Sequence, residues 1–205
     1  VTCGMKARIE EILKKEAEAI AHIPVSDQFE EAVDLLYEQI HQKGAKVVVS
    51  GMGKAGQIGI SIATTFCSTG TPAIFLHPSE AQHGDLGILQ QNDVLLLLSN
   101  SGKTREIVEL VALAEKIYPE QYRIVITGDM DSPLAKCGAK VLHTGSPKEV
   151  CPLNLTPTTS TTVMSVIGDV LTVLLMEKIQ FTAEDSALRQ HSRYLNKKAR
   201  QQFDQ

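Results

Sequence analysis

The chain has 205 residues, 43% of them hydrophobic and 21% charged, which is the balance of a globular protein able to bury a core without disulfides or metal. Its net charge of −4 argues against a general affinity for nucleic acid or anionic membranes, because those partners favour strongly basic surfaces. Aromatic residues make up 4% and tryptophan is absent, so few side chains are available on which bases or sugar rings could stack.

The first 43 residues predict a helical arm over 6–43. An amphipathic helix over 6–21 has apolar residues three and four positions apart, and a second helix starts after Ser26 or Asp27. Five short apolar runs follow, of the kind found in strands covered on both faces: 45–49, 73–76, 93–98, 122–126 and 139–142. Helical segments accompany these runs, at 55–68, 104–118 and 132–137.

This alternation predicts an α/β fold, a doubly wound sheet of five parallel strands flanked by helices. A long helix over 160–180 and a shorter one after Thr182 come next, and a basic tail occupies 189–205. No repeat or linker divides the sequence, so we expect a single domain over 1–205. Ligands bind such sheets at the carboxyl ends of the strands, and the loops after the apolar runs are therefore the candidate sites.

The cysteines and the apolar segments narrow the class of protein. Cys3, Cys67, Cys137 and Cys151 form no CxxC pair and have no regular spacing, so we expect neither a disulfide framework nor a metal site. The charged segment 6–16 lacks the apolar core of a signal peptide, and the apolar runs are too short to cross a membrane. We therefore expect a cytoplasmic protein that binds neither membranes nor nucleic acid.

The loop SGMGKAG (50–56) follows the first predicted strand and contains the pattern GxGxxG. A dinucleotide site would also need an acidic residue at the end of the second strand, where the chain has His77 and Pro78 instead. A tight turn between strand and helix is the structural alternative. We favour a contact to phosphate or sugar oxygens from this loop, which begins with Ser50 and Gly51, with Lys54 projecting into the crevice.

The loop after the third predicted strand is more informative. Its residues Ser99, Asn100, Ser101 and Thr104 lead directly into a helix, so hydroxyl groups and successive backbone N–H groups lie beside a positive helix end. This combination binds a phosphate group, although a helix cap with solvated neighbours is the simpler alternative.

Two further segments carry ionisable residues at the same predicted edge. HPSEAQHGDLG (77–87) includes His83 and is compatible with metal ligation, acid–base chemistry or an ordinary exposed loop. GSPKEVCPL (145–153) places Lys148 and Glu149 between prolines that hold them near the rim. TPTTSTT (156–162) is interpreted as the cap of the long helix.

Taken together, these motifs resemble the sugar isomerase (SIS) domain family and, within it, the arabinose 5-phosphate isomerases. The SNSG loop is common to the superfamily, whereas PKEVCPLNLTPTTSTT (147–162) and GDVLTVLLMEKIQFTAEDSAL (168–188) are more specific. The resemblance runs from about residue 8 to 191 and implies a tetramer that needs no cofactor and interconverts D-ribulose 5-phosphate and D-arabinose 5-phosphate. That reaction is the first step toward Kdo, an acidic sugar of lipopolysaccharide. Many relatives continue into a pair of CBS domains, whereas this sequence stops at residue 205, so we expect the short, single-domain form.

The resemblance also implies roles for individual residues. Ser50, Ser99, Ser101 and Thr104 correspond to the phosphate-binding positions, and the family's functional lysine, glutamates and histidines correspond to Lys54, Glu106, Glu149, His83 and His191. Lys103 stands where many relatives have an acid, which predicts an added positive charge beside the phosphate. The usual His-Pro-Gly-Gly is replaced by a different sequence after His191.

Isomerisation through an enediol needs a base at carbon and donors for the developing oxyanion. We expect Glu149 to be the base, with a pKa raised by burial, and Lys54 to stabilise the enediolate. His83 and His191 would move protons between the oxygens, and Glu106 would orient one of these groups.

Several alternatives stay open: an isomerase of phosphohexuloses or phosphoheptoses, a sensor of sugar phosphates without catalysis, or, less favoured, a dinucleotide-binding protein. As to regulation, the activated sugar CMP-Kdo would compete at the phosphate crevice.

Overall fold

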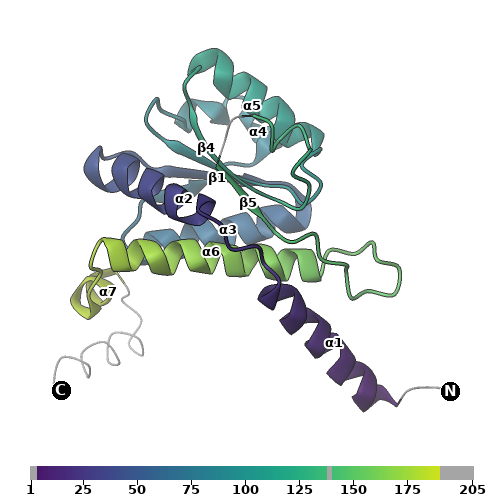
Figure 1. Ribbon diagram of the computed structural model, residues 1–205. Helices are drawn as coiled ribbons and strands as arrows, with labels where there is room; N and C mark the ends of the chain where they lie inside the picture. Colours follow the sequence, from purple (N-terminus) through teal and green to yellow (C-terminus); the bar gives the residue numbers. More distant parts are fainter. Residues whose placement is uncertain (1–3, 138–139, 190–205) are drawn as a thin grey trace.

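The structure is a computed structural model that describes residues 4–137 and 140–189, and it has three layers, with a parallel sheet between two layers of helices (Figure 1). The expected α/β fold with five parallel strands is confirmed. The strands lie in the order β2-β1-β3-β4-β5, and their bounds are β1 Val47–Gly51, β2 Ala73–Phe75, β3 Val94–Leu98, β4 Tyr122–Thr127 and β5 Lys140–His143.

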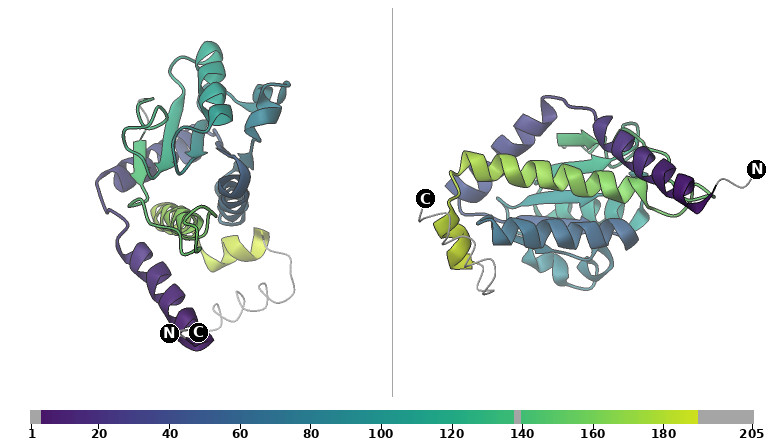
Figure 2. Two further views of the ribbon diagram at one scale, coloured as in Figure 1. Left: turned by 90° about the vertical axis from the view of Figure 1, so that its right-hand side faces the viewer. Right: turned by 90° about the horizontal axis from the view of Figure 1, so that it is seen from below.

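Helices cover both faces of the sheet because alternate residues of its central strands are apolar on both sides. α2 (Gln28–Leu36), α3 (Gly53–Ser68) and α6 (Thr159–Lys178) pack on the face to which Val47 and Val49 contribute. α4 (Pro78–Ala81) and α5 (Arg105–Ile117) pack on the opposite face, with Val48. Figure 2 shows α3 and α6 side by side beneath the sheet.

The predicted elements differ from the structure in three places. α2 continues into a π-helical turn, η1 (Tyr37–Gln42), and the segment expected to be a loop contains α4 and a short 3-10 helix, η2 (Asp85–Ile88). The helix expected over 132–137 is absent: this segment is a series of turns. There the Leu134 N–H donates to the Gly102 carbonyl of the neighbouring loop, and only isolated turn bonds, such as Lys136 N–H to the Ser132 carbonyl, form within the segment.

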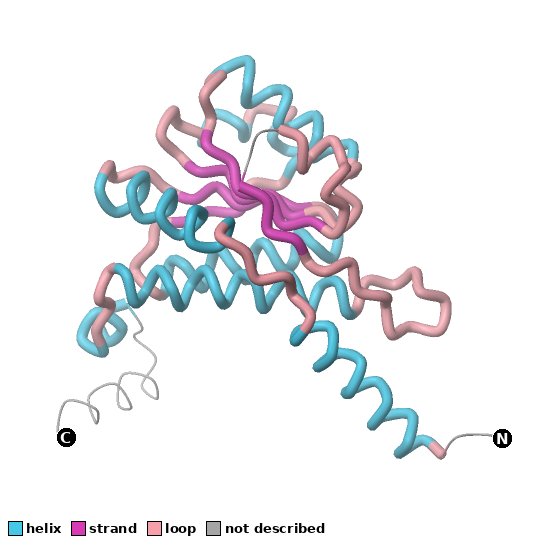
Figure 3. Tube along the Cα trace, viewed as in Figure 1, coloured by secondary structure: helices cyan, strands magenta, loops and turns pink. Residues whose placement is uncertain are grey.

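The two terminal helices lie at the edge of the molecule (Figure 3). α1 (Met5–Ala21) has no buried residue and extends away from the body, with its main contacts to α6. α7 (Ala183–Arg189) follows the carboxyl end of α6 and also has no buried residue. α1 contacts the central core only through partly buried residues such as Ala19.

α6 corrects one expectation about apolar length. With 20 residues and a mean hydropathy of 1.6, it is long and apolar enough to cross a membrane by length and composition. Half of that stretch is buried inside the molecule, and Val163, Ile167 and Leu171 belong to the core beneath the sheet. The apolar composition of α6 is therefore accounted for by packing within this fold.

The strand order creates a crevice at one edge of the sheet. From β1 the chain crosses to β2 on one side, whereas β3 is followed by β4 and β5 on the other. The loops after β1 and β3 consequently diverge, and in open α/β sheets this switch point is where ligands bind.

Candidate active site

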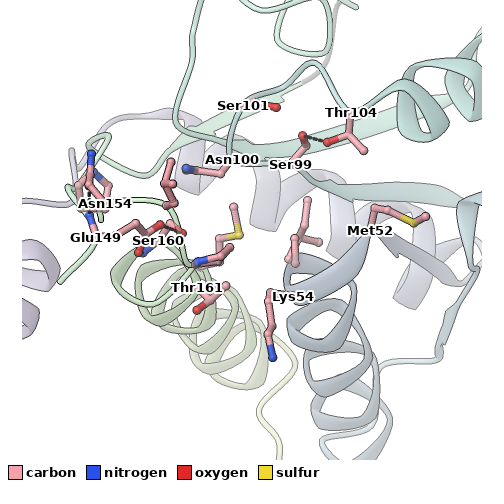
Figure 4. A pocket seen from close by; sticks show the side chains of 16 residues that line it. Met52, Lys54, Ser99, Asn100, Ser101, Thr104, Glu149, Asn154, Ser160 and Thr161 are labelled. Atoms are coloured by element: carbon pink, nitrogen blue, oxygen red, sulfur yellow. Dashed lines mark hydrogen bonds between the residues drawn. The ribbon is translucent and has the colours of Figure 1, made fainter. Parts of the chain in front are cut away.

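A cavity of about 400 Å³ lies at this switch point, at the carboxyl ends of β1 and β3 (Figure 4). Its walls come from the two loops, from the start of α3, from the segment after β5 and from the first turns of α6. The lining residues are Met52, Lys54, Ala55, Leu98, Ser99, Asn100, Ser101, Thr104, Pro147, Glu149, Asn154, Leu155, Pro157, Ser160, Thr161 and Met164.

The Ser99–Thr104 loop forms one wall. The Ser99 and Thr104 hydroxyls lie 2.8 Å apart, and the Gly102 N–H donates to the Ser99 hydroxyl at 3.1 Å. The Lys103 N–H donates to the Ser101 hydroxyl at 3.2 Å. These bonds fold the loop tightly against the amino end of α5, where backbone N–H groups and the helix dipole favour an anion. The wall has the chemistry of a phosphate site.

Lys103 does not add the positive charge expected beside this wall. Its amine lies 2.8 Å from the Asp129 carboxylate, and its side chain does not line the cavity. The Lys103 amine donates a hydrogen bond to the Asp129 carboxylate, and this bond raises the pKa of Lys103 and lowers the pKa of Asp129. The extra charge is thus paired with an acid from the loop after β4.

Ser50 and Gly51 lie inside the sheet, outside the cavity lining. β1 extends to Gly51, and Ser50 is level with Leu97 of β3, two residues short of Ser99. The Ser50 hydroxyl is fully buried and donates to the Leu76 carbonyl at 2.7 Å. A Cβ on Gly51 would lie 2.9 Å from the Ala55 carbonyl oxygen, so this glycine permits the close packing of strand against helix.

Lys54 lines the cavity from the first turn of α3. Its side chain is exposed and, in Figure 4, extends away from the Ser99–Thr104 loop. Among the residues that the structure describes, no hydrogen-bond or ion-pair partner holds the Lys54 amine. The amine is therefore available to a bound ligand.

Glu149 lies on the opposite wall, at the amino end of α6. One carboxylate oxygen accepts from the Thr158 N–H at 2.7 Å, the Thr158 hydroxyl at 2.8 Å and the Ser160 N–H at 3.3 Å. The other oxygen accepts from the Ser160 hydroxyl. The Glu149 N–H donates to the Asn154 side chain at 2.8 Å, which anchors the backbone as well.

These hydrogen bonds shift the pKa of Glu149 in the direction opposite to the one expected. Burial by itself raises the pKa of Glu149, but the hydrogen bonds from Ser160 and Thr158 outweigh it and hold the pKa below the ordinary carboxyl value. The expectation of a raised pKa is wrong for this structure. Glu149 is ionised at neutral pH and caps α6 from outside the helix.

Two of the other predicted catalytic residues lie in the described part of the chain, and neither enters the cavity. His83 is exposed between α4 and η2, and Glu106 is half-buried in the first turn of α5; neither lines the cavity. His191 lies outside the described residues. Within the described part of the chain, no three His, Cys, Asp or Glu side chains are grouped so as to hold a metal ion.

Sequence reasoning missed the contribution of the amino end of α6. Asn154, Ser160, Thr161 and Met164 line the cavity, although the run TPTTSTT by itself predicts only a helix cap. A usable signal is present in the sequence: this Ser/Thr-rich run begins a helix directly after the loop that carries Glu149 (the Glu149 loop, residues 144–158). Because α6 starts directly after this loop, its first turns form part of the cavity wall.

Comparison with known proteins agrees with this geometry. The profile of the SIS domain family matches residues 39–174. The arabinose 5-phosphate isomerase KdsD of Pseudomonas aeruginosa PAO1 is 49% identical over 163 residues, covering 80% of this chain and 48% of that protein. KdsD of Escherichia coli K12 is 44% identical over 179 residues, covering 87% of this chain and 53% of that protein. The chain thus spans about half the length of these relatives.

Two solved structures are similar over nearly their whole length. A candidate phosphosugar isomerase involved in capsule formation from Bacteroides fragilis NCTC 9343 superposes with a TM-score of 0.92 at 62% identity, over 93% of this chain and all of that one. The c3406 protein of Escherichia coli CFT073, solved in complex with arabinose 5-phosphate, has a TM-score of 0.80 at 36% identity, over 88% of this chain and 94% of that one. Because the family profile covers more than half of the sequence and the fold agrees, the chain belongs to the SIS domain family.

Proposed function

We propose that this protein is an aldose–ketose isomerase that interconverts D-ribulose 5-phosphate and D-arabinose 5-phosphate through an enediol. The observation that carries the proposal is the pairing of two walls across one cavity: a phosphate-type loop on one side, and an ionised carboxylate with an exposed amine on the other. The relatives named arabinose 5-phosphate isomerase and the neighbour solved with arabinose 5-phosphate support this choice of substrate.

In this proposal the phosphate is bound by Ser99, Asn100, Ser101 and Thr104, assisted by the amino end of α5. Ser50 and Gly51 support that wall from within the sheet, through the Ser50–Leu76 bond and the close approach of β1 to α3. Phosphate binding at one end then sets the distance at which the carbonyl carbons meet the opposite wall.

Glu149 is the proposed carbon base, and Lys54 the group that stabilises the enediolate. The lowered pKa keeps Glu149 in the basic form at neutral pH, but it also makes the carboxylate a weaker base. A substrate hydroxyl that competes for the Ser160 and Thr158 donors would free the carboxylate and raise its basicity. The exposed Lys54 amine, which no described residue holds, can turn toward the developing negative charge.

His83 and His191 are proposed to move protons between the sugar oxygens from neighbouring subunits, with Glu106 as an orienting residue. The Arg189 guanidinium lies over the Phe181 ring, and Phe181 packs against Gly70, beyond the carboxyl end of α3. Lys54 is at the other end of this 16-residue helix, about 24 Å away. His191 itself lies outside the described residues, and we propose that it serves the cavity of another copy.

This arrangement requires an oligomer, and we propose a homotetramer. α1 exposes Met5, Ile9 and Leu13, and α6 exposes Val170 and Val173, which are apolar surfaces that a second copy could cover. We further propose a cytoplasmic enzyme, without a cofactor, in the synthesis of Kdo and lipopolysaccharide. CMP-Kdo would act there as a competitive inhibitor at the phosphate crevice.

A coupled assay with D-ribulose 5-phosphate, fructose 6-phosphate and sedoheptulose 7-phosphate tests the proposal. We expect a clear preference for the pentulose phosphate, and exchange of the migrating hydrogen in D₂O. Preference for a hexose or heptose phosphate would assign another isomerase, whereas binding without turnover would indicate a sensor. Glu149→Gln should abolish turnover while phosphate binding stays measurable, and near-normal turnover would remove Glu149 as the base.

A further inference from the structure

α1 reaches the Glu149 loop through two polar contacts. The Glu16 carboxylate accepts a hydrogen bond from the Thr159 hydroxyl at 2.8 Å, and Arg8 donates to the Val150 carbonyl at 3.3 Å. These partners are 143 and 142 positions apart in the chain. α1 has no fully buried residue, although Ala19 packs against the core, and the two polar contacts tie the helix to Val150 and to the first residue of α6.

Thr159 transmits the contact to the residue next to Glu149. Its hydroxyl has one proton, which it donates to Glu16, so the oxygen presents a lone pair to the Val150 N–H at 3.2 Å. Val150 is bonded at both its N–H and its carbonyl, and both bonds lead to α1, one through Thr159 and one through Arg8. The peptide that follows Glu149 is therefore held in one orientation.

The same loop separates two cavities. Pro147, Glu149 and Asn154 line the active-site cavity and also a second cavity of about 550 Å³, whose far wall is formed by α1. A displaced loop would enlarge one cavity at the expense of the other and move the Glu149 carboxylate relative to the Ser99–Thr104 wall.

We propose that Glu16 is a positioning residue, which acts through the Thr159 hydroxyl to hold Glu149 at the distance from the phosphate wall that turnover requires. The inference deepens the proposed function and rests on it, since Glu149 is taken as a group that meets the substrate. It adds α1, which contacts the body mainly through α6, to the parts that determine catalysis.

Four variants test this link in the full chain. Thr159→Val keeps the shape but removes the hydroxyl, Thr159→Ser retains the hydroxyl, Glu16→Ala removes the acceptor, and Glu16→Gln retains an acceptor oxygen. Glu10→Ala is the matched control, because Glu10 is an exposed carboxylate on the same helix with no described partner.

We expect Thr159→Val and Glu16→Ala to lower kcat about 10- to 100-fold, as a misplacement of about 1 Å does, with KM nearly unchanged because the phosphate wall is untouched. Thr159→Ser, Glu16→Gln and Glu10→Ala should stay close to the unmodified protein. If Thr159→Val fails to fold because Thr159 is buried, Glu16→Ala carries the test on a helix that has no fully buried residue.

Hydrogen exchange of the Val150 amide gives a readout independent of activity. Exchange should accelerate in Thr159→Val and Glu16→Ala but not in Glu10→Ala. A kcat and an exchange rate in Glu16→Ala that match those of Glu10→Ala would overturn the inference. An unmodified chain that isomerises no sugar phosphate would instead overturn the proposed function, and the exchange comparison would still report whether Glu16 holds the loop.

Discussion

Gly102 occupies a position in the Ser99–Thr104 loop where no side chain fits. Its φ is +60°, and a Cβ would lie 2.0 Å from the Ser132 hydroxyl oxygen, which is fully buried and cannot move aside. We expect Gly102→Ala to lower the free energy of unfolding by about 1–3 kcal/mol and to raise KM for the sugar phosphate, because the loop must shift. Urea denaturation and steady-state kinetics measure both effects. Gly87→Ala is the control, since nothing lies within 4 Å of that position; equal behaviour of the two variants would contradict the argument.

Ser50 and Ser99 show how far single residues can be predicted from the sequence. Both follow a run of apolar residues and precede glycine-containing loops, so the sequence predicts both at the crevice. The predicted first strand ends two residues early, and the actual strand places Ser50 level with Leu97, inside the sheet. The direction of a side chain at a strand end depends on register with the neighbouring strand, which an isolated sequence segment does not contain.

At the scale of elements, the cap of α6 comes from a distant carboxylate. Thr158, at the N-cap position, makes no side-chain capping bond, whereas Glu149 accepts from Thr158 and Ser160. Apolar periodicity predicts where α6 runs, but a cap supplied from nine residues upstream depends on the path of an irregular loop. The acidity of Glu149 could not be predicted for the same reason: burial was foreseeable, but its donors were not.

This cap predicts a pH-dependent stability. Because the pKa of Glu149 is lowered on folding, its stabilisation is present above the ordinary carboxyl range and is lost as the pH falls through the folded value. Glu149→Gln should therefore cost about 1 kcal/mol at neutral pH, and the difference from the unmodified protein should shrink in acid. The ionisable residues that line the two cavities together with Glu149 are Lys54 of α3, Lys15 and Glu18 of α1, His22 directly after α1, and Lys148. Glu16 is linked to the Glu149 loop through Thr159.

Urea denaturation of the two proteins across pH measures this difference. The exposed Glu120, changed to Gln, is the control and should show no comparable pH-dependent loss. A cost of Glu149→Gln that stays constant from neutral to acid would show that the charge of the cap contributes nothing.

At the scale of the whole molecule, the layered core was predictable and the placement of the terminal helices was not. Unbroken apolar runs require cover on both faces, and the β–α alternation supplies that cover. α1 is amphipathic, but Met5, Ile9 and Leu13 remain exposed in the single chain. Amphipathic periodicity indicates that a helix has a face to bury, but it does not say whether the covering surface belongs to the same chain.

α6 exposes the apolar residues Val170 and Val173. A substitution there tests whether a second copy of the chain covers this part of the surface. Val173 is 51% exposed and Ile117, at the end of α5, is 52% exposed, so the two residues have similar character on opposite faces of the sheet. Val173→Glu adds a charge that would have to be desolvated in an interface, and we expect it to dissociate the oligomer and abolish isomerase activity while the subunit stays folded. Ile117→Glu should change neither property. Sedimentation equilibrium measures the oligomeric state, circular dichroism the folding of the subunit, and the coupled assay the activity. A fully active monomer would contradict the proposal that His83 and His191 act in neighbouring subunits. An intact oligomer of Val173→Glu would place the interface elsewhere.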